Sequence, residues 1–342
     1  MWYNITFPEM QQKLKHYTGV GTLLILVALI AGAAGIIGCA PPTQNVQVRT
    51  WSDLNGIRNN LGAVYVLAND LDSTTAGYEQ LASPTANNGK GWQPIGTIDS
   101  SFYGSFDGQG HEIRDLFIDR PAERDVGLFG AVYNQTTTLI ENLGVVNAKV
   151  TGQDYVGILA GTNYGTISSC YSSGNVTGDE YVGALVGGNA AAVSACYSIG
   201  SVVGGTLVGG LLGGNTGTVG NSYSVTSAIG DSRVGGLTGG NGGTVSNCYS
   251  AGSVGGNDDI GGLVGADFDG TVTNSFWDTQ TSGQAASSGG IGKTTVEMKT
   301  TATFSGAGWN IIGVTSPTTR NASYTWNMVN GSTYPFLSSQ ST

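Results

Sequence analysis

Charged side chains are scarce in this chain. Asp, Glu, Lys and Arg make up 11% of its 342 residues, against about 25% in an average soluble domain. Only 13 residues are Lys or Arg, and they form no cluster. Binding to DNA or RNA requires clustered cations that displace counterions from phosphates, so the sequence argues against a nucleic-acid partner. The formal net charge of −10 suits solubility, loose cation binding or a cationic partner.

Proline is also scarce, at 8 residues beside 57 glycines. Together they stay below the share of about 25–30% that is typical of low-complexity disorder. Hydrophobic residues reach 39%, which is enough for a sizeable core. A composition with few charges and many Gly, Ser, Thr and Asn residues is common in extracellular β-proteins and unusual in cytosolic enzymes.

The one long hydrophobic run lies near the N-terminus. Residues 18–38 carry no charge and follow Lys13 and Lys15, as in a signal peptide with a positive n-region and an apolar h-region. The run is also long enough to span a bilayer as a helix, which needs about 20 residues.

The end of this run bears on how the chain is anchored. The run ends in Ile36-Ile37-Gly38-Cys39, which resembles the lipobox of bacterial lipoproteins and implies lipidation of Cys39. An uncleaved signal anchor with an incidental cysteine is the alternative. Either reading of residues 1–38 places the body on the outer face of the membrane, attached through lipid or the N-terminal helix. Residues 39–50 then form a tether.

A repeat dominates the rest of the chain. Its units begin with Val-Gly or Ile-Gly and recur with a period of about 26 residues, which is typical of solenoids, propellers and other repeat arrays. The six starts are Val126, Val156, Val182, Val208, Val234 and Ile260. Short runs of Val, Thr and Tyr between Gly and Asn predict strands and turns, and no apolar period of 3.6 long enough for a helix occurs in the repeats.

The same residue types recur at fixed positions of each unit. One unit cannot bury its own apolar face, so identical positions must stack in successive coils about 4.8 Å apart. We therefore predict a parallel β-solenoid with continuous side-chain ladders, turned at its corners by glycines such as Gly157, Gly183, Gly209, Gly235 and Gly261. The aliphatic ladder contains Leu159, Leu185, Leu211, Leu237 and Leu263, the aromatic ladder Tyr171, Tyr197, Tyr223 and Tyr249, and the amide ladder Asn163, Asn189, Asn215 and Asn241.

The units GGLLGGNTGTVGNSYS (209–224) and GGLTGGNGGTVSNCYSAGSV (235–254) resemble the GLUG repeat. That repeat occurs in many bacterial and archaeal surface proteins and beside the catalytic domain of immunoglobulin-A-cleaving metallopeptidases. The resemblance covers roughly residues 50–338. It implies an all-β, right-handed parallel β-helix with a role in adhesion or surface structure.

The flanks of the repeats read as caps, because open solenoid ends expose unpaired strands. Residues 51–125 form the expected N-terminal cap with the first irregular coils, residues 126–276 the repeats, and residues 277–342 the C-terminal cap. If the solenoid binds a ligand, exposed aromatic residues of the caps are the expected contacts, namely Trp92, Tyr103 and Trp309.

Catalytic constellations are weak in this sequence. A metallopeptidase of the resembled kind would need a helical H-E-x-x-H motif, and His111-Glu112 has no second histidine after it. A polysaccharide-degrading enzyme would need two carboxylates about 5–9.5 Å apart. The one plausible set of carboxylates lies in the N-terminal cap and consists of Asp70, Asp72, Asp107, Asp115 and Asp119. We favour structural roles in turns for these residues over catalysis.

Two further clusters suggest ligands or crosslinks. Acidic turns recur before several coils and could share Ca²⁺, although solvated turn residues are the favoured reading. They include Asp154, Asp179, Asp231 and Asp258. Cys170, Cys196 and Cys248 share one position, which favours buried thiols over a disulfide between Cys170 and Cys196.

The expected function is therefore a cell-surface, membrane-tethered solenoid that acts as a non-catalytic adhesin or binding module, with no cofactor. Its partner would be a glycan, a matrix protein or a neighbouring cell. The alternatives are a structural envelope or spacer protein without a dedicated ligand, and a polysaccharide lyase or hydrolase that uses the N-terminal acids.

Overall fold

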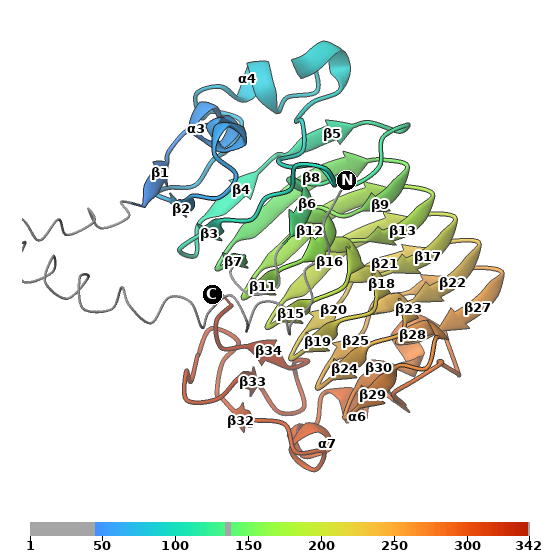
Figure 1. Cartoon of the computed structure of the whole chain (residues 1–342). Helices are drawn as coiled ribbons and strands as arrows, with labels where there is room; N and C mark the ends of the chain where they lie inside the picture. The colour runs from blue at the N-terminus through green and yellow to red at the C-terminus, as the bar shows by residue number, and fades with distance from the viewer. Residues whose placement is uncertain (1–44, 134–137, 341–342) are drawn as a thin grey trace, which may run out of the picture. The chain divides into compact units, whose positions relative to one another are not determined.

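The computed structural model describes residues 45–133 and 138–340. The predicted leader (1–38), Cys39 and the first part of the tether lie outside these residues, so their assignments stay predictions. The body from Asn45 onward forms one compact unit. Figure 1 shows its strands stacked in chain order, from β3 near one end to β29 near the other.

Each coil of the repeats passes through four parallel sheets. We number them 1 to 4 in the order in which a coil visits them, and the chain adds one coil after another to all four. Sheet 1 contains β9 (Asp154–Val156), β13 (Glu180–Gly183), β17 (Thr206–Gly209), β22 (Ser232–Gly235) and β27 (Asp258–Gly261). Sheet 2 contains β6 (Phe129–Tyr133), β10 (Ala160–Tyr164), β14 (Val186–Asn189), β18 (Leu212–Asn215), β23 (Thr238–Asn241) and β28 (Val264–Asp267).

Sheets 3 and 4 begin in the N-terminal region, before the regular repeats. Sheet 3 contains β1 (Val46–Val48), β2 (Val64–Leu67), β3 (Ser105–Asp107), β7 (Leu139–Glu141), β11 (Thr166–Ser168), β15 (Ala192–Ser194), β19 (Thr218–Gly220), β24 (Thr244–Ser246) and β29 (Thr271–Thr273). Sheet 4 contains β4 (Glu112–Arg114), β5 (Phe117–Asp119), β8 (Gly144–Thr151), β12 (Tyr171–Thr177), β16 (Tyr197–Val203), β20 (Tyr223–Ser224), β21 (Ser227–Ile229), β25 (Tyr249–Ser250), β26 (Val254–Gly255), β30 (Phe276–Asp278) and β31 (Ile291–Lys293).

The register of the strands follows the sequence period. Val182 pairs with Val208, and Val208 pairs with Val234, so each strand pairs with the same position of the next repeat. The predicted parallel β-solenoid, in which each repeat of about 26 residues forms one coil that contacts its neighbours, is therefore confirmed. The right-handed winding stays a prediction.

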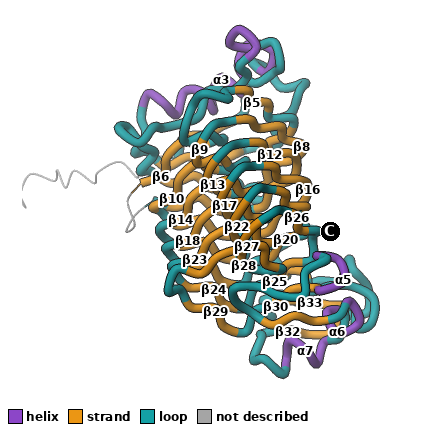
Figure 2. The backbone as a smooth tube through the Cα atoms, turned by 90° about the vertical axis from the view of Figure 1, so that its right-hand side faces the viewer, coloured by secondary structure: helices purple, strands orange, loops and turns teal. Residues whose placement is uncertain are grey.

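Short helices lie at the two ends of the solenoid (Figures 1 and 2), and one small sheet near the C-terminal end packs beside the tyrosine ladder. The N-terminal end has α3 (Trp51–Gly56), η1 (Ile57–Asn59), α4 (Tyr78–Leu81) and η2 (Ala86–Gly89). The C-terminal end has α5 (Thr279–Ser282), α6 (Thr295–Met298), α7 (Thr301–Ser305) and a sheet of β32 (Ile311–Gly313), β33 (Trp326–Met328) and β34 (Phe336–Leu337).

The interior of the solenoid is an apolar column that runs its whole length. The five leucines of the predicted aliphatic ladder are fully buried. Cys170, Cys196 and Cys248 are buried free thiols in the same core, and burial raises the pKa of the Cys248 thiol to about 12. These cysteines therefore serve as small core residues, as expected.

The amide ladder forms as predicted at the end of sheet 2. The side-chain nitrogen of Asn163 donates to the side-chain oxygen of Asn189 over 2.8 Å, and two further bonds of the same length continue the ladder to Asn241. Each amide also donates to the backbone carbonyl two residues later. Buried polar groups are costly unless they are paired, so the ladder satisfies amides that the coil corner buries.

The predicted role of the corner glycines is wrong. Gly183 and Gly209 have no positive φ; the residue two positions before each, Tyr181 and Leu207, has φ of 56° and 55°. A Cβ on Gly209 would lie 1.8 Å from the carbonyl oxygen of Leu212. The glycine is needed because the corner brings the backbone too close for a side chain.

The expectation that Trp92 and Trp309 are exposed contacts is also wrong. Trp92 has no exposed surface, because it packs edge-on against Trp51 and seals the N-terminal end of the core. Trp309 is 5% exposed and its indole donates to the carbonyl of Asn274. Tyr103 is exposed, at 54%.

The tyrosine ladder lies outside the solenoid core. Successive rings of Tyr171, Tyr197, Tyr223 and Tyr249 stack with centroids 4.8–5.0 Å apart and planes within 3° of parallel. The C-terminal cap covers much of this ladder and builds a second apolar cluster against it, including Phe304, Trp309 and Trp326.

Candidate functional site

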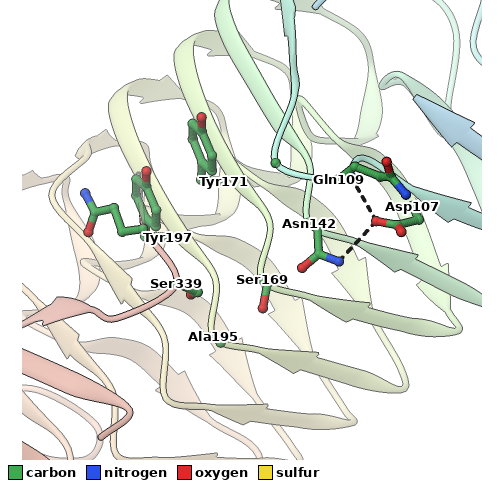
Figure 3. A pocket seen from close by; sticks show the side chains of 10 residues that line it. Asp107, Gln109, Asn142, Ser169, Tyr171, Ala195, Tyr197 and Ser339 are labelled. Carbon is green, nitrogen blue, oxygen red and sulfur yellow. Dashed lines mark hydrogen bonds between the residues drawn. The ribbon is translucent and has the colours of Figure 1, made fainter. Parts of the chain in front are cut away.

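One hollow lies beside the open end of the tyrosine ladder. Its volume is about 480 Å³. Figure 3 shows Tyr171 and Tyr197 on one side and Asp107, Gln109 and Asn142 on the other. The C-terminal residues Ser339 and Gln340 border it.

The single carboxylate that lines the described part of this hollow, Asp107, is the last residue of β3 and accepts hydrogen bonds from the turn that follows. Asp107 accepts hydrogen bonds from the backbone N–H of Gln109 (2.9 Å) and the side-chain amide of Asn142 (3.1 Å), drawn as dashed lines in Figure 3. Glycoside hydrolysis needs two carboxyl groups that face one bond. No second acid lines the described part of this hollow.

Three of the other four predicted acids of the N-terminal region also have structural partners. Asp70 accepts from the ring of His111 and from the backbone N–H of Glu112, each at 3.0 Å. Asp72 accepts from Thr74 and Thr75 in a tight turn, and these hydrogen bonds lower the pKa of its carboxyl group. Asp115 accepts from the amide of Asn147. Asp119 is exposed in β5.

The predicted calcium ligands do not share one column. Asp154 and Asp258 lie at the coil position occupied by Glu180, Thr206 and Ser232 in between. Asp179 and Asp231 lie one position earlier, on either side of Gly205. Within the described residues, no three His, Cys, Asp or Glu side chains come close enough to hold a metal ion.

A larger hollow runs along the outer face of sheet 2. This groove, which we call the sheet 2 groove, has a volume of about 570 Å³. That is within the range of about 300–1,000 Å³ typical of ligand sites. Its floor is a row of glycines on β14, β18 and β23, namely Gly188, Gly214 and Gly240. These glycines are buried beneath the side chains of the groove wall. A Cβ on Gly188 or Gly214 would lie 2.9 Å from the ring of Tyr155 or Tyr181.

One wall of the groove comes from the strands of sheet 1. Tyr155 and Tyr181 stand on it with rings stacked 4.5 Å apart, and Leu207 and Arg233 continue the same column in the next coils. All four residues have φ between 54° and 56°, a left-handed conformation that bulky residues rarely adopt. Burial, together with the neighbouring Tyr181, raises the pKa of Tyr155, so its phenol stays protonated.

The opposite wall follows the last residues of the sheet 2 strands. Tyr164 stands at one end of it and Phe268 at the other, with Ala190, Thr216 and Gly242 between them. Phe268 is 49% exposed. Four coil spacings separate Tyr164 from Phe268, which is about 19 Å at the usual strand spacing of about 4.8 Å.

The sequence prediction missed this groove for a specific reason. Its ladders were found because one residue type recurs once in every repeat, whereas the groove walls change type from coil to coil. The available signal was the residue before each Val-Gly or Ile-Gly start, which is Tyr155, Tyr181, Leu207, Arg233 and Asp259 in turn. When the residue type changes from repeat to repeat at one position and stays constant at its neighbours, the stacking of the coils does not require a particular residue type at that position.

Known proteins resemble the chain in fold and in part of the sequence. No family model matches it. Halomucin from Haloquadratum walsbyi is 35% identical over 143 residues, which is 40% of this chain and 2% of halomucin. A candidate Gly-rich membrane protein from Evansella cellulosilytica is 29% identical over 173 residues, 46% of this chain and 19% of that protein. The matched regions are thus a small part of both relatives.

Among solved structures, a candidate immunoglobulin A1 protease from Bacteroides ovatus has a TM-score of 0.59 and 20% sequence identity. The match covers 86% of this chain and 92% of that one, and at this identity it shows a shared fold alone. In the described part of the chain, no helix combines the length and the apolar character needed to cross a bilayer.

Proposed function

We propose that the chain is a non-catalytic binding module of the cell surface, which presents its solenoid to a glycan or matrix ligand. The sheet 2 groove carries this proposal, because it is an open, aromatic-walled hollow on an otherwise regular scaffold. Its aromatic residues contribute little to the solenoid core, which is filled by the ladders inside. The names of the two relatives, a halomucin and a membrane protein, support a location at the membrane or cell surface.

The absence of paired acids supports binding over catalysis. Asp107 is the one carboxylate lining the hollow at the tyrosine ladder, and Glu180 is the one lining the groove. Neither of these hollows, within the described residues, offers the acid and base that bond cleavage in a polysaccharide requires.

Retention on immobilised polysaccharides tests the proposal. The full chain is purified in a detergent without a sugar headgroup and passed over a panel of neutral and acidic polysaccharides, while released fragments are assayed. We expect retention without new reducing ends or unsaturated sugars. Fragment release that is lost in Asp107→Asn would indicate an enzyme, and passage through every column would favour the structural spacer.

A further inference from the structure

Arg233 is an unusual residue for its place in the chain. Lys149 and Arg233 are the two cationic residues between positions 126 and 276, a stretch with nine acidic residues. Arg233 lines the sheet 2 groove near Phe268, whose ring centroid lies 5.6 Å from the guanidinium carbon. Arg233 therefore makes this end of the groove the position where a negatively charged group of a ligand would bind.

The guanidinium of Arg233 is loosely held within the protein. Its nitrogen Nε lies 4.0 Å from a carboxylate oxygen of Asp259, and the two side chains are 43% and 53% exposed. At 4.0 Å this contact is too long for a hydrogen bond, and the guanidinium donates no hydrogen bond to any other described residue. A guanidinium has five N–H donors in a planar fork that fits a carboxylate, so Arg233 retains donors for a ligand.

The groove floor excludes one mode of binding, the addition of a polypeptide strand to the sheet. Strands β14, β18 and β23 are paired on both sides within sheet 2, so their backbone N–H and C=O groups are engaged along the sheet. An added polypeptide strand binds through such groups and finds none free on this face. The ligand must be recognised by side chains.

Those side chains offer hydroxyl groups and aromatic carbon. Tyr155, Tyr164 and Tyr181 contribute phenols, and the exposed residue Thr216 contributes a hydroxyl that also donates to the carbonyl of Asn189 over 3.4 Å. Hydroxyl groups beside apolar side chains suit a chain of sugar rings, which present apolar faces and hydroxyl edges. Glu180 lines the groove two coils away from Arg233 and disfavours a second acidic group at that distance.

We propose that the sheet 2 groove binds an acidic glycan, with a sugar carboxylate on Arg233 and the neutral sugars of the chain along the column of Tyr181 and Tyr155. This inference rests on the proposed binding function and gives it a ligand class and a site. The acid specifies the orientation of the glycan along the groove, which extends about 19 Å from Tyr164 to Phe268.

Titration calorimetry with a matched pair of ligands tests the site. The probes are a hyaluronan hexasaccharide, which has a uronic acid at alternate positions, and the same hexasaccharide with its carboxylates reduced to alcohols. The full chain should bind the acidic form about 10- to 100-fold more tightly, as a charged hydrogen bond contributes. Arg233→Gln should remove this preference and leave affinity for the reduced form unchanged.

Two further variants separate the groove from general charge effects. Lys149→Gln removes the other cation of the repeats, which lies on β8 in sheet 4, and should bind as the unaltered chain does. Thr216→Trp places a large side chain at an exposed position of the groove wall and should weaken both hexasaccharides. Thermal melts of each variant confirm that the solenoid is intact.

The outcomes distinguish this inference from the function on which it rests. An acid preference that survives Arg233→Gln, full binding by Thr216→Trp, or no binding of either hexasaccharide overturns the groove assignment. Retention of some polysaccharide on the columns in those cases leaves the proposed function standing. Failure of every column removes the binding function itself.

Discussion

At the scale of single residues, close backbone contact decides which positions of a coil are interchangeable. Gly209 and Gly255 are both glycines of the repeats with negative φ. A Cβ on Gly209 would lie 1.8 Å from the carbonyl oxygen of Leu212, whereas a Cβ on Gly255 would have no atom within 4 Å. The glycine composition of the chain therefore has more than one cause, which a count of glycines does not separate.

This contrast gives a matched pair of substitutions. Gly209→Ala should lower the free energy of unfolding by about 1–3 kcal/mol, because the methyl group forces the corner apart. Gly255→Ala should change it by no more than about 1 kcal/mol, with stabilisation expected from the loss of freedom in the unfolded chain. Urea denaturation followed by circular dichroism measures both. Equal effects would show that the close approach at Gly209 relaxes at no cost.

The residues with positive φ differ in type between two parts of each coil. At the corner between sheets 3 and 4 these positions hold small or polar residues, such as Ser169, Ala195 and Asn221. In the sheet 1 strands beside the sheet 2 groove they hold Tyr181, Leu207 and other large side chains. Asn tolerates this conformation more readily than bulky residues do, so the backbone conformation does not account for the large side chains beside the groove.

At the scale of elements, the repeats were predictable and the caps were not. The constant spacing of the repeat starts from Val156 to Ile260 fixes which residues stack, because each strand pairs in register with the same position one coil later. The caps have no such period. Burial of Trp92 and Trp309 depends on how non-repeating segments fold back over the ends, and no pattern in the sequence reports that.

The C-terminal cap also covers the tyrosine ladder, which the repeat pattern predicted as part of the solenoid without any contact to the cap. Tyr197, Tyr223 and Tyr249 face this cap, and Tyr249 donates to the carbonyl of Pro335 over 2.7 Å. Burial and the neighbouring phenols of the ladder raise the pKa of Tyr197 and Tyr249, and burial raises that of Tyr223. The ladder therefore makes the attachment of the cap sensitive to alkaline pH.

The sign of this effect follows from proton linkage. An unfolded tyrosine ionises near pH 10, whereas these three stay protonated in the folded state to higher pH. Their contribution to stability is complete below pH about 10 and is lost as the pH rises from there toward the folded pKa. Fluorescence of Trp309 and Trp326, recorded from pH 9 to 12, should report loosening of the cap above pH about 10.

A variant with Phe at all three positions (Tyr197→Phe, Tyr223→Phe and Tyr249→Phe) provides the control. It keeps stacked rings and has no ladder phenol to ionise at these positions, so its cap should hold to higher pH than the native cap. Identical profiles for the two proteins would mean that other groups cause the alkaline transition.

At the scale of the whole molecule, the solenoid is a stack of nearly equivalent coils between two dissimilar ends. Each coil contacts the coils before and after it through all four sheets, so stability is approximately a sum of coil and interface terms. Length can then change without a change of fold. The groove changes with it, since each of the four coils that start at Val156, Val182, Val208 and Val234 contributes one residue to its floor and one to each wall.

Removal of one complete coil tests this modularity. Deletion of residues 182–207 joins Tyr181 to Val208, the same kind of junction that the native chain has at Tyr181-Val182. The Leu, Asn and Tyr columns stay in register, Tyr223 stacks on Tyr171, and the C-terminal cap keeps Tyr223 and Tyr249 beneath it. We expect a cooperative melt and a β-rich circular dichroism spectrum, with a lower melting temperature because one coil interface is lost.

Deletion of residues 183–207, which is one residue shorter, should behave differently. From the junction onward it shifts every side chain by one position, and a shift of one residue in a strand turns its inward side chains outward. The buried leucines and the amide ladder would then lose their partners, and we expect no cooperative melt. If both deletions fold equally well, the caps and not the ladders set the register of the coils. The repeat period would then have to be explained by function, because a ligand would require a fixed spacing between the groove residues.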